Sequence, residues 1–266
     1  MAAVSGRLVI IGTGPGAPEW RSPETSALIQ AATDLVGYGP YLDLIGDATD
    51  GKRRHVSDNR EELGRAREAL ALAAEGRSVA LVSSGDPGVF GMAAAVFEVL
   101  DREPSWRGID ITVAPGISAM LAAASRAGAP LGHDFCVLSL SDNLKPWEVV
   151  EQRIEAAGRA DFVLVIYNPA SSLRGWQLDR ARDLMLQHRA ASTPVVLARN
   201  LGRDGEIVRV VRLDALTASE TDMRTLVIIG STKTTLIARP PSEQHGDATP
   251  WVYTPRHYTI EDAPDR

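Results

Sequence analysis

The chain has 266 residues, a length that suits two domains of ordinary size. Hydrophobic residues make up 44% and charged residues 23%, which excludes a largely disordered chain, and no window approaches the roughly 18 apolar residues of a membrane span. The net charge of -6 argues against a nucleic-acid-binding surface, and the single cysteine, Cys136, excludes an internal disulfide or a cysteine-built metal site. We therefore expect a cytoplasmic protein without nucleic-acid or membrane partners.

In the first half of the chain, short apolar runs alternate with helical patterns, which is typical of strand–helix–strand units on a mostly parallel sheet. Strands are expected at residues 7–13, 34–38, 78–84 and 110–114. Helices are expected at 60–76, 90–103 and 117–128. Asp58 and Glu61 resemble a capping box at the start of the first of these helices.

The second half begins after a turn-rich stretch at residues 126–134 that reads as an interdomain linker. Strands are expected at 135–141, 161–168, 194–200, 207–213 and 225–231. Only two long helices, at 146–159 and 176–189, separate them, which predicts a mixed sheet. The sequence thus predicts an N-terminal α/β domain at 1–128, a C-terminal α/β domain at 129–240 and an extended, proline-rich tail at 241–266.

The glycines after the first strand resemble a dinucleotide fingerprint, since "GTGPGA" at residues 12–17 satisfies its relaxed form. The surroundings disagree with that interpretation. Pro15 offers no N–H to a pyrophosphate, Pro18 and Pro23 delay the helix, and no acidic residue ends the second strand. The pattern favours a pocket for another ligand, with a plain tight turn as the alternative and a dinucleotide site as the weakest interpretation.

Other familiar motifs are incomplete in this sequence. "GSTKT" at Gly230 lacks the glycine before the lysine that a phosphate-binding loop needs. "GISAM" at Gly116 lacks the second glycine of a nucleophile elbow. The five histidines are scattered and no pair stands at metal-ligand spacing, so no metal site is expected.

Five strand ends share one design of small residues, proline and one or two polar side chains. They read "IIGTGPG", "VSSGDPG", "VAPGISA", "IYNPAS" and "ARNLGR". Small residues allow a ligand to approach the backbone closely, and ligands of open α/β sheets bind at the carboxyl ends of strands. A single such loop is typical of any α/β protein, whereas five together indicate a binding site.

Three of these motifs carry a family resemblance. "GTGPG" at 12–16, "SGDPGVFG" at 84–91 and "PGISA" at 115–119, in this order, resemble the tetrapyrrole methylases, a family of S-adenosylmethionine-dependent methyltransferases. The resemblance covers nearly the whole chain. Longer strings at 132–154, 160–171, 198–206 and 251–258 resemble the branch that methylates precorrin-3B at C17 and contracts its ring to give precorrin-4 in cobalamin synthesis.

The resemblance implies two α/β domains with an active cleft between them, usually in a homodimer, with S-adenosylmethionine folded in the cleft and S-adenosylhomocysteine as its product. It places "GTGPG" in the tetrapyrrole trough. The positions that match the family's cofactor contacts are Gly85, Asp86, Gly88, Val89, Ser118, Ala119, Tyr167, Asn168, Asn200, Thr225 and Leu226. The expected contacts with the tetrapyrrole are Gly14, Pro15, Lys145 and Arg199. For Asp86, a turn aspartate is an equally good interpretation.

Methyl transfer from a sulfonium needs mainly positioning, whereas ring contraction gains from a placed proton donor or acceptor. The candidates for that role are Thr13, Ser84 and Asp142, with His133 and Tyr167 as further ones that packing or capping would equally explain. The substrate's carboxylates need local positive charge, and arginine suits bidentate carboxylate binding. Beside Lys145 and Arg199, the basic candidates are Lys52, Arg53, Arg54, Arg174 and Arg203.

Three alternatives stay open on the sequence. A methylase of this superfamily can act on ribosomal RNA or a protein side chain, although the net acidity argues against it. A non-catalytic tetrapyrrole carrier would keep the fold and would not consume the cofactor. The physiological substrate is either metal-free or cobalt-loaded, as in the anaerobic route.

Overall fold

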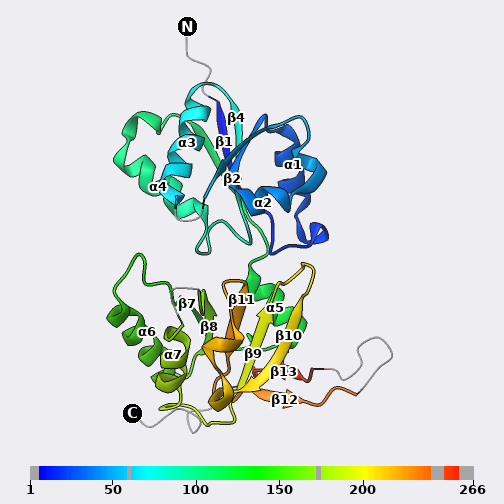
Figure 1. Cartoon of the computed structure of the whole chain (residues 1–266), viewed down its shortest axis with the longest axis vertical. Helices are drawn as coiled ribbons and strands as arrows, with labels where there is room; N and C mark the ends of the chain where they lie inside the picture. The colour runs from blue at the N-terminus through cyan, green and yellow to red at the C-terminus, as the bar shows by residue number, and fades with distance from the viewer. Residues whose placement is uncertain (1–5, 59–60, 172–174, 241–248, 258–266) are drawn as a thin grey trace. The chain divides into compact units, whose positions relative to one another are not determined.

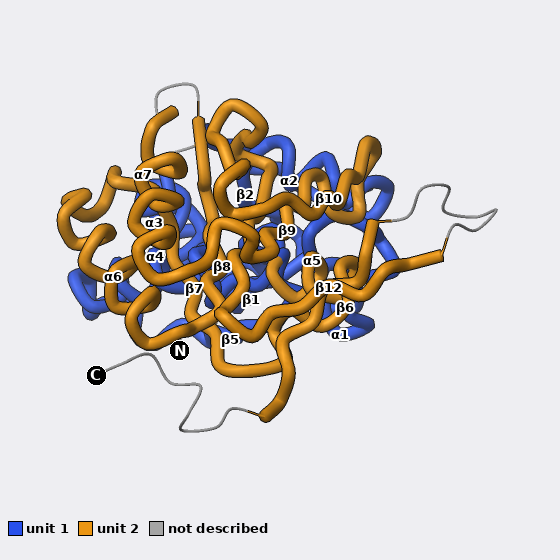
Figure 2. The backbone as a smooth tube through the Cα atoms, turned by 90° about the horizontal axis from the view of Figure 1, so that it is seen from below, with its two compact units in different colours: residues 1–119 blue, residues 120–266 orange. Residues whose placement is uncertain are grey.

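The computed structural model describes residues 6–58, 61–171, 175–240 and 249–257. The chain divides into two compact units, Met1–Ala119 and Met120–Arg266 (Figure 2). The sequence-based boundary at residue 128 lies further along the chain, at the end of a helix whose residues from Met120 onward cluster with the second unit.

Unit 1 is built on a five-stranded parallel sheet of order β3-β2-β4-β1-β5. Its strands are β1 Arg7–Gly12, β2 Asp34–Tyr38, β3 Arg53–Ser57, β4 Ser78–Ser83 and β5 Asp110–Ala114. The four strands expected from the sequence are confirmed. Strand β3 was not expected, because it lies at the sheet edge and its residues, which begin Arg53-Arg54-His55, are half-buried or exposed rather than apolar.

Helices cover both faces of the unit 1 sheet (Figure 1). Helices α1 (Pro23–Ala31) and α2 (Gly39–Asp43) pack on one face, and α3 (Glu62–Ala74) and α4 (Met92–Arg102) pack on the other. The expected capping box is half formed. The Glu61 carboxylate accepts a hydrogen bond from the Asp58 backbone N–H at 3.1 Å, but Glu61 is itself the N-cap of α3 and no side chain caps the helix.

Unit 2 contains a mixed five-stranded sheet of order β10-β9-β11-β8-β7, as expected. Its strands are β7 Phe135–Ser139, β8 Val163–Tyr167, β9 Pro194–Arg199, β10 Ile207–Arg212 and β11 Thr225–Ile229. Strands β7 and β8 are parallel, whereas β11 runs antiparallel to both β8 and β9. Helices α6 (Trp147–Arg159) and α7 (Gln177–Met185) cover one face, and α5 (Ala119–Ala127) lies on the other side (Figures 1 and 2).

A second, three-stranded sheet in unit 2 joins segments far apart in the sequence. Its strands are β6 Gly128–Ala129, β12 Thr235–Ile237 and β13 Trp251–Tyr253, and β13 lies between the other two. The expected linker at 126–134 therefore contains a strand of unit 2, and the expected tail contributes β13. Residues 241–248 and 258–266 of that tail are outside the described residues.

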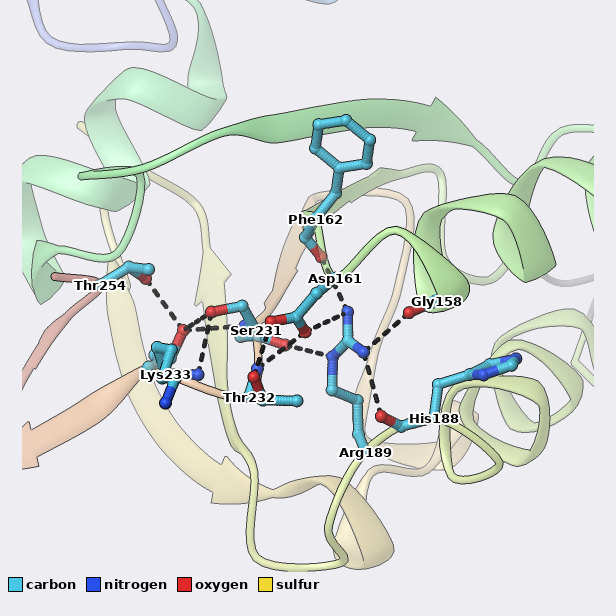
Figure 3. A network of polar contacts seen from close by, with 11 residues as sticks. Gly158, Asp161, Phe162, His188, Arg189, Ser231, Thr232, Lys233 and Thr254 are labelled. Carbon is cyan, nitrogen blue, oxygen red and sulfur yellow. Dashed lines mark hydrogen bonds and ion pairs between the residues drawn. The ribbon is translucent and has the colours of Figure 1, made fainter. Parts of the chain in front are cut away.

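A buried ion pair lies at the end of the unit 2 sheet where β8 begins (Figure 3). Arg189 and Asp161 lie 2.9 Å apart with both side chains 1% exposed. Arg189 also donates to the backbone carbonyls of Gly158, Phe162, His188 and Gly230. Asp161 accepts from the backbone N–H and the hydroxyl of Thr232. The pair therefore ties the end of α6 and the start of β8 to the turn after β11.

The longest described helices, α3 and α6, have 13 residues each. Across the ranges that the structure describes, no helix combines the length and apolar character needed to cross a membrane.

Candidate functional site

The three glycine motifs of unit 1 meet at one edge of its sheet. They follow β1, β4 and β5, which are neighbours and parallel, so their carboxyl ends lie side by side. Gly14 and Gly85 form an isolated bridge in which each backbone N–H donates to the other's carbonyl, at 3.2 and 2.8 Å. The first two loops are thereby held together by backbone hydrogen bonds.

Close backbone contacts explain why glycine occurs at two of these positions. A Cβ on Gly116 would lie 2.1 Å from the carbonyl oxygen of Gly85, and one on Gly12 would lie 2.6 Å from the backbone N of Gly116. Side chains do not fit at such distances without moving the backbone. The glycines of all three motifs therefore form one interlocked set of loops.

Asp86 connects the second loop to the third. Its Oδ1 accepts a hydrogen bond from the backbone N–H of Gly88 at 2.8 Å, and its Oδ2 accepts one from the backbone N–H of Gly116 at 3.0 Å. The turn role that the sequence left open for Asp86 is thus present in the structure. A direct contact with a cofactor stays a prediction.

The two hydroxyl candidates of unit 1 also lie in these loops. Thr13 is buried and its hydroxyl donates to the Ser83 carbonyl at 3.2 Å, while the Ser84 hydroxyl donates to the Gly14 carbonyl at 3.4 Å. Both hydroxyls therefore donate to backbone oxygens, and a hydroxyl oxygen is by its chemistry also a hydrogen-bond acceptor.

Gly85 is less crowded than Gly12 and Gly116. A Cβ built there would contact nothing closer than 3.9 Å, and one of the atoms at that distance is the backbone N of Ala119, the first residue of α5. Backbone N–H groups at a helix start bind carboxylates well. Gly88 is exposed and Val89 is half-buried, whereas Ser118 is buried. Their contact with the cofactor stays a prediction.

The candidates of unit 2 gather at one edge of its sheet. Because β11 is antiparallel to its neighbours, the ends of β8 and β9 lie beside the start of β11, which begins with Thr225 and Leu226. Asn168 and Asn200 follow β8 and β9 directly, and both adopt left-handed backbone conformations, with φ of 52° and 53°. Asn tolerates this conformation better than most residues, and it turns the chain sharply at the strand end.

Polar contacts hold this second group of residues in place. The Asn168 amide donates to the hydroxyl of Ser139, at the end of β7, at 2.9 Å. The Thr225 hydroxyl donates to Asp222 Oδ1 at 2.9 Å. The Tyr167 hydroxyl accepts from the backbone N–H of Met120, near the start of α5, at 3.1 Å. Tyr167 therefore helps to satisfy a helix terminus, a role that the sequence did not suggest.

The expected substrate-binding cations differ in their surroundings. Arg199 pairs with Asp222, with Nε and Oδ2 2.9 Å apart. Burial, and then the charge of Arg153, lowers the pKa of the Lys145 amine. Asp142, three residues earlier, accepts from the Gln177 amide at 3.4 Å. His133 lies 3.9 Å from Asp134, between Nδ1 and Oδ2.

The basic run at residues 52–54 lies away from the glycine loops. Arg53 begins β3 and lies opposite Asp34, the first residue of β2, in the register of the sheet. The basic run therefore lies at the amino ends of these two strands. Lys52 donates to the carbonyls of Gln30 and Ala32 at the end of α1, and Arg54 forms an ion pair with Asp43. These contacts explain Lys52 and Arg54 without a ligand. Arg174 is outside the described residues.

Sequence reasoning missed one cation beside the first loop. Arg21 follows "GTGPGAPEW" and precedes α1, and the Nε of its guanidinium is buried without a partner. The sequence carries no signal for this, because it depends on what surrounds the side chain. Among the described residues, no group of three or more His, Cys, Asp or Glu side chains could hold a metal ion.

Comparison with known proteins agrees with this architecture. The family model of the Tetrapyrrole (Corrin/Porphyrin) Methylases matches residues 7–217, and the chain belongs to this family of S-adenosylmethionine-dependent methyltransferases. The precorrin-3B C(17)-methyltransferase of Sinorhizobium sp. is 48% identical over 96% of this chain and 98% of that protein. The family resemblance expected from the three motifs is confirmed.

Two further comparisons refine the picture. The probable cobalt-factor III C(17)-methyltransferase of Salmonella typhimurium strain LT2 is 41% identical over 95% of this chain and 100% of that protein. A crystal structure of the methyltransferase CobJ has a TM-score of 0.86 and 45% identity, and the match covers 94% of this chain and 100% of that chain. The expected fold class, α/β with a parallel first sheet and a mixed second one, is confirmed.

Proposed function

We propose that the protein transfers a methyl group from S-adenosylmethionine to C17 of precorrin-3B and contracts the ring to give precorrin-4, a step of cobalamin biosynthesis. The observation that carries the proposal is the likeness to the Sinorhizobium enzyme over almost its full length, at 48% identity. The interlocked loops at Gly14, Gly85 and Gly116 support it, because they lie together at the carboxyl edge of a parallel sheet, where ligands of such folds bind.

When bound, S-adenosylmethionine supplies an electrophilic methyl group on a sulfonium sulfur. The protein's task in this step is to orient the two reactants and exclude water, since the transfer itself needs little acid–base help. We assign cofactor binding in unit 1 to the loop residues Gly85 to Val89, with Ser118 and Ala119. In unit 2 we assign it to Tyr167, Asn168, Asn200, Thr225 and Leu226.

Ring contraction needs a proton donor or acceptor near the reacting carbons. We propose Thr13, Ser84 and Asp142 for this role and Gly14, Pro15, Lys145 and Arg199 as contacts with the tetrapyrrole. The hydroxyls of Thr13 and Ser84 donate to backbone carbonyls, so they are oriented to accept from a substrate hydroxyl. The Asp142 carboxylate accepts a hydrogen bond from the Gln177 amide at 3.4 Å, and a carboxylate is a suitable proton acceptor.

The proposal includes a homodimer, which the family resemblance implies, and a cytoplasmic location, which the composition of the chain favours. Sedimentation at several protein concentrations tests the oligomeric state. The domain division proposed from the sequence, at residues 128 and 240, is tested by expressing residues 1–128 alone, which should fold if the division is right.

Mass spectrometry of the pigment tests the activity. The purified protein is incubated with methyl-labelled S-adenosylmethionine and either precorrin-3B or its cobalt-loaded counterpart. One labelled methyl group and a contracted ring from the metal-free pigment are expected. Labelling of the cobalt form alone would move the protein to the reaction named for the Salmonella relative. Labelling of neither pigment, with S-adenosylmethionine bound and unconsumed, would contradict the proposal and favour a tetrapyrrole carrier.

Labelling of RNA or of a protein would favour another kind of methylase. The same incubation is therefore run with ribosomal RNA, and no transfer of the label to RNA is expected.

A further inference from the structure

Gln177 is a polar residue at a buried position of α7. It is the first residue of this helix and is 2% exposed. The other buried residues of α7 are apolar, namely Leu178, Ala181, Leu184 and Met185. Among the described residues, the Oε1 of Gln177 has no hydrogen-bond partner, although it is shielded from solvent. A buried polar atom without a partner lowers stability, so an apolar side chain would serve packing better at this position.

The amide of Gln177 faces Asp142, on the loop between β7 and α6. Its Nε2 donates to Asp142 Oδ2 at 3.4 Å. The loop begins with a turn in which Ser139 Oγ accepts from the Ser141 backbone N–H at 3.2 Å and from the Asn168 amide at 2.9 Å. Because β7 and β8 are parallel, this loop leaves the same carboxyl edge of the sheet at which Asn168 lies. Asp142 and Gln177 thus meet beside the candidate site of unit 2.

Contacts between α6 and α7 fix the start of α7 relative to this loop. The rings of Trp147, the first residue of α6, and Trp176, the N-cap of α7, pack edge to face with centroids 4.8 Å apart. Glu151 of α6 accepts from the Trp147 indole N–H at 2.8 Å and from Arg180 Nε of α7 at 2.6 Å. The end of α7 that carries Gln177 is therefore tied to the end of α6 that follows the Asp142 loop.

A carboxamide can serve a carboxyl group in both of its protonation states. Its NH2 group donates to an ionised carboxylate, and its oxygen accepts from the O–H of a protonated one. A half-turn of the amide about its last side-chain torsion exchanges nitrogen and oxygen in almost the same volume. In Gln177, this rotation brings Oε1 to the side that faces Asp142.

We propose that Gln177 is a positioning residue for Asp142, which it holds both before and after that carboxylate takes up a proton in ring contraction. The inference rests on the proposed function, which assigns the role of proton acceptor to Asp142. As the proton passes from the substrate to Oδ2, the negative charge passes from the carboxylate to the substrate. The new O–H of Asp142 then donates to Gln177 Oε1, and Gln177 itself neither gains nor loses a proton. The oxygen that lacks a partner in the first state has one in the second.

Product analysis of Gln177→Met and Gln177→Glu tests the proposal, because ring contraction needs acid–base help and methyl transfer needs little. Chromatography separates the methylated pigments made from precorrin-3B, and carbon NMR of the labelled products distinguishes contracted from uncontracted rings. In Gln177→Met, the ratio of contracted to uncontracted product should fall roughly tenfold or more. Gln177→Glu keeps the shape, but an ionised carboxyl cannot donate to Asp142, so the fall should be at least as large. Asp142→Asn should lower the ratio roughly a hundredfold.

Leu178→Ala and Gln187→Met are the matched controls. Leu178 is fully buried in the core of unit 2, so its truncation should lower the Tm through packing alone. Gln187 is exposed and lies just beyond α7. Both controls should keep the product ratio within about twofold of the wild type. Gln177→Met should have a Tm equal to or above that of the wild type, because it removes the buried oxygen that lacks a partner.

NMR of the side-chain amides tests the contact without turnover. The NH2 signals of Gln177 are those missing from the spectrum of Gln177→Met, and they should shift in Asp142→Asn. Unshifted signals, or a wild-type product ratio in both Gln177 variants, would overturn the proposal. Equal losses of methyl transfer and contraction, with a lowered Tm, would mark Gln177 as a packing residue and would overturn it too. Wild-type enzyme that methylates neither the metal-free nor the cobalt-loaded pigment would instead refute the proposed function, and the Gln177 assignment with it.

Discussion

Asp86 holds Gly116 through a hydrogen bond of 3.0 Å between its Oδ2 and the glycine's backbone N–H. The same carboxylate caps its own turn at Gly88. This one side chain therefore sets the position of the loop that leads into α5 relative to the loop after β4.

Replacing Asp86 with Ala should loosen both loops, because two backbone N–H groups lose their acceptor. We expect the free energy of unfolding to fall by about 1–3 kcal/mol. Asp86→Asn keeps one acceptor oxygen and should lose less. Urea unfolding measures the stability, and calorimetric titration with S-adenosylhomocysteine should show weaker binding in the same order, Ala weaker than Asn. Equal stability of wild type and Asp86→Ala would contradict the role assigned to this carboxylate.

Adding a methyl group at Gly116 should disrupt the interlocked loops. The new Cβ would lie 2.1 Å from the Gly85 carbonyl oxygen, so the backbone must move, at a cost of about 1–3 kcal/mol or more. Gly64→Ala is the matched control, because Gly64 lies in α3 with nothing within 4 Å of its Cβ position. That variant should gain about 0.5–1 kcal/mol from helix propensity. Thermal unfolding should shift in opposite directions in the two variants.

Breaking the buried ion pair in unit 2 should destabilise the protein strongly. Arg189→Met leaves the Asp161 carboxylate without its cation in a site where both side chains are 1% exposed. The expected loss is about 3–5 kcal/mol. Arg212→Met breaks the Arg212–Asp214 pair, whose side chains are 60% and 40% exposed, and should change stability far less, because water screens an exposed pair. Denaturant unfolding of both variants gives the comparison, and similar losses in the two would refute it.

The carboxylate of Asp222 should make stability depend on pH in the acid range. Burial by itself would raise its pKa, but hydrogen bonds from Arg199, Thr225 and the Arg224 backbone outweigh burial and lower the pKa. Because the folded pKa lies below the unfolded value of about 3.9, the stabilisation is present above that value and is lost as the pH falls through the folded pKa. The stability difference between wild type and Asp222→Asn should therefore shrink below about pH 4. A difference that stays constant from neutral pH into this range would exclude Asp222 as its source.

The sequence predicted the buried strands and also β5, β7 and β10, which are partly exposed but still apolar in sequence. Strands β1, β4, β8, β9 and β11 read as continuous apolar runs because helices or other strands cover them. Strand β3 was missed because an edge strand keeps charged side chains in water. The short strands β6, β12 and β13 were missed because their pairing depends on partners far away in the sequence, which a local pattern does not contain.

The sequence predicted which loops form the candidate site. It did not predict which side chains are hydrogen-bonded or ion-paired to one another there. Parallel strands put the loops after β1, β4 and β5 together, so the motif order was enough to expect that they meet. The pairing of Arg199 with Asp222 depends on the turn before β11, which the sequence does not mark. Arg21 was missed because its distinctive property is that its buried Nε has no hydrogen-bond partner. Such a property can be seen only once its neighbours are placed.

The sheet that joins β6 to β13 also affects the timing of folding during protein synthesis. All five strands of the unit 1 sheet have left the ribosome once Ala114 has emerged, so this unit can form while translation continues. Gly128 and Ala129 must wait for their partners Val252 and Tyr253. The nascent chain therefore carries an unpaired strand edge through most of the translation of unit 2. A pause before codon 251 would prolong the period in which chaperones or proteases can reach it.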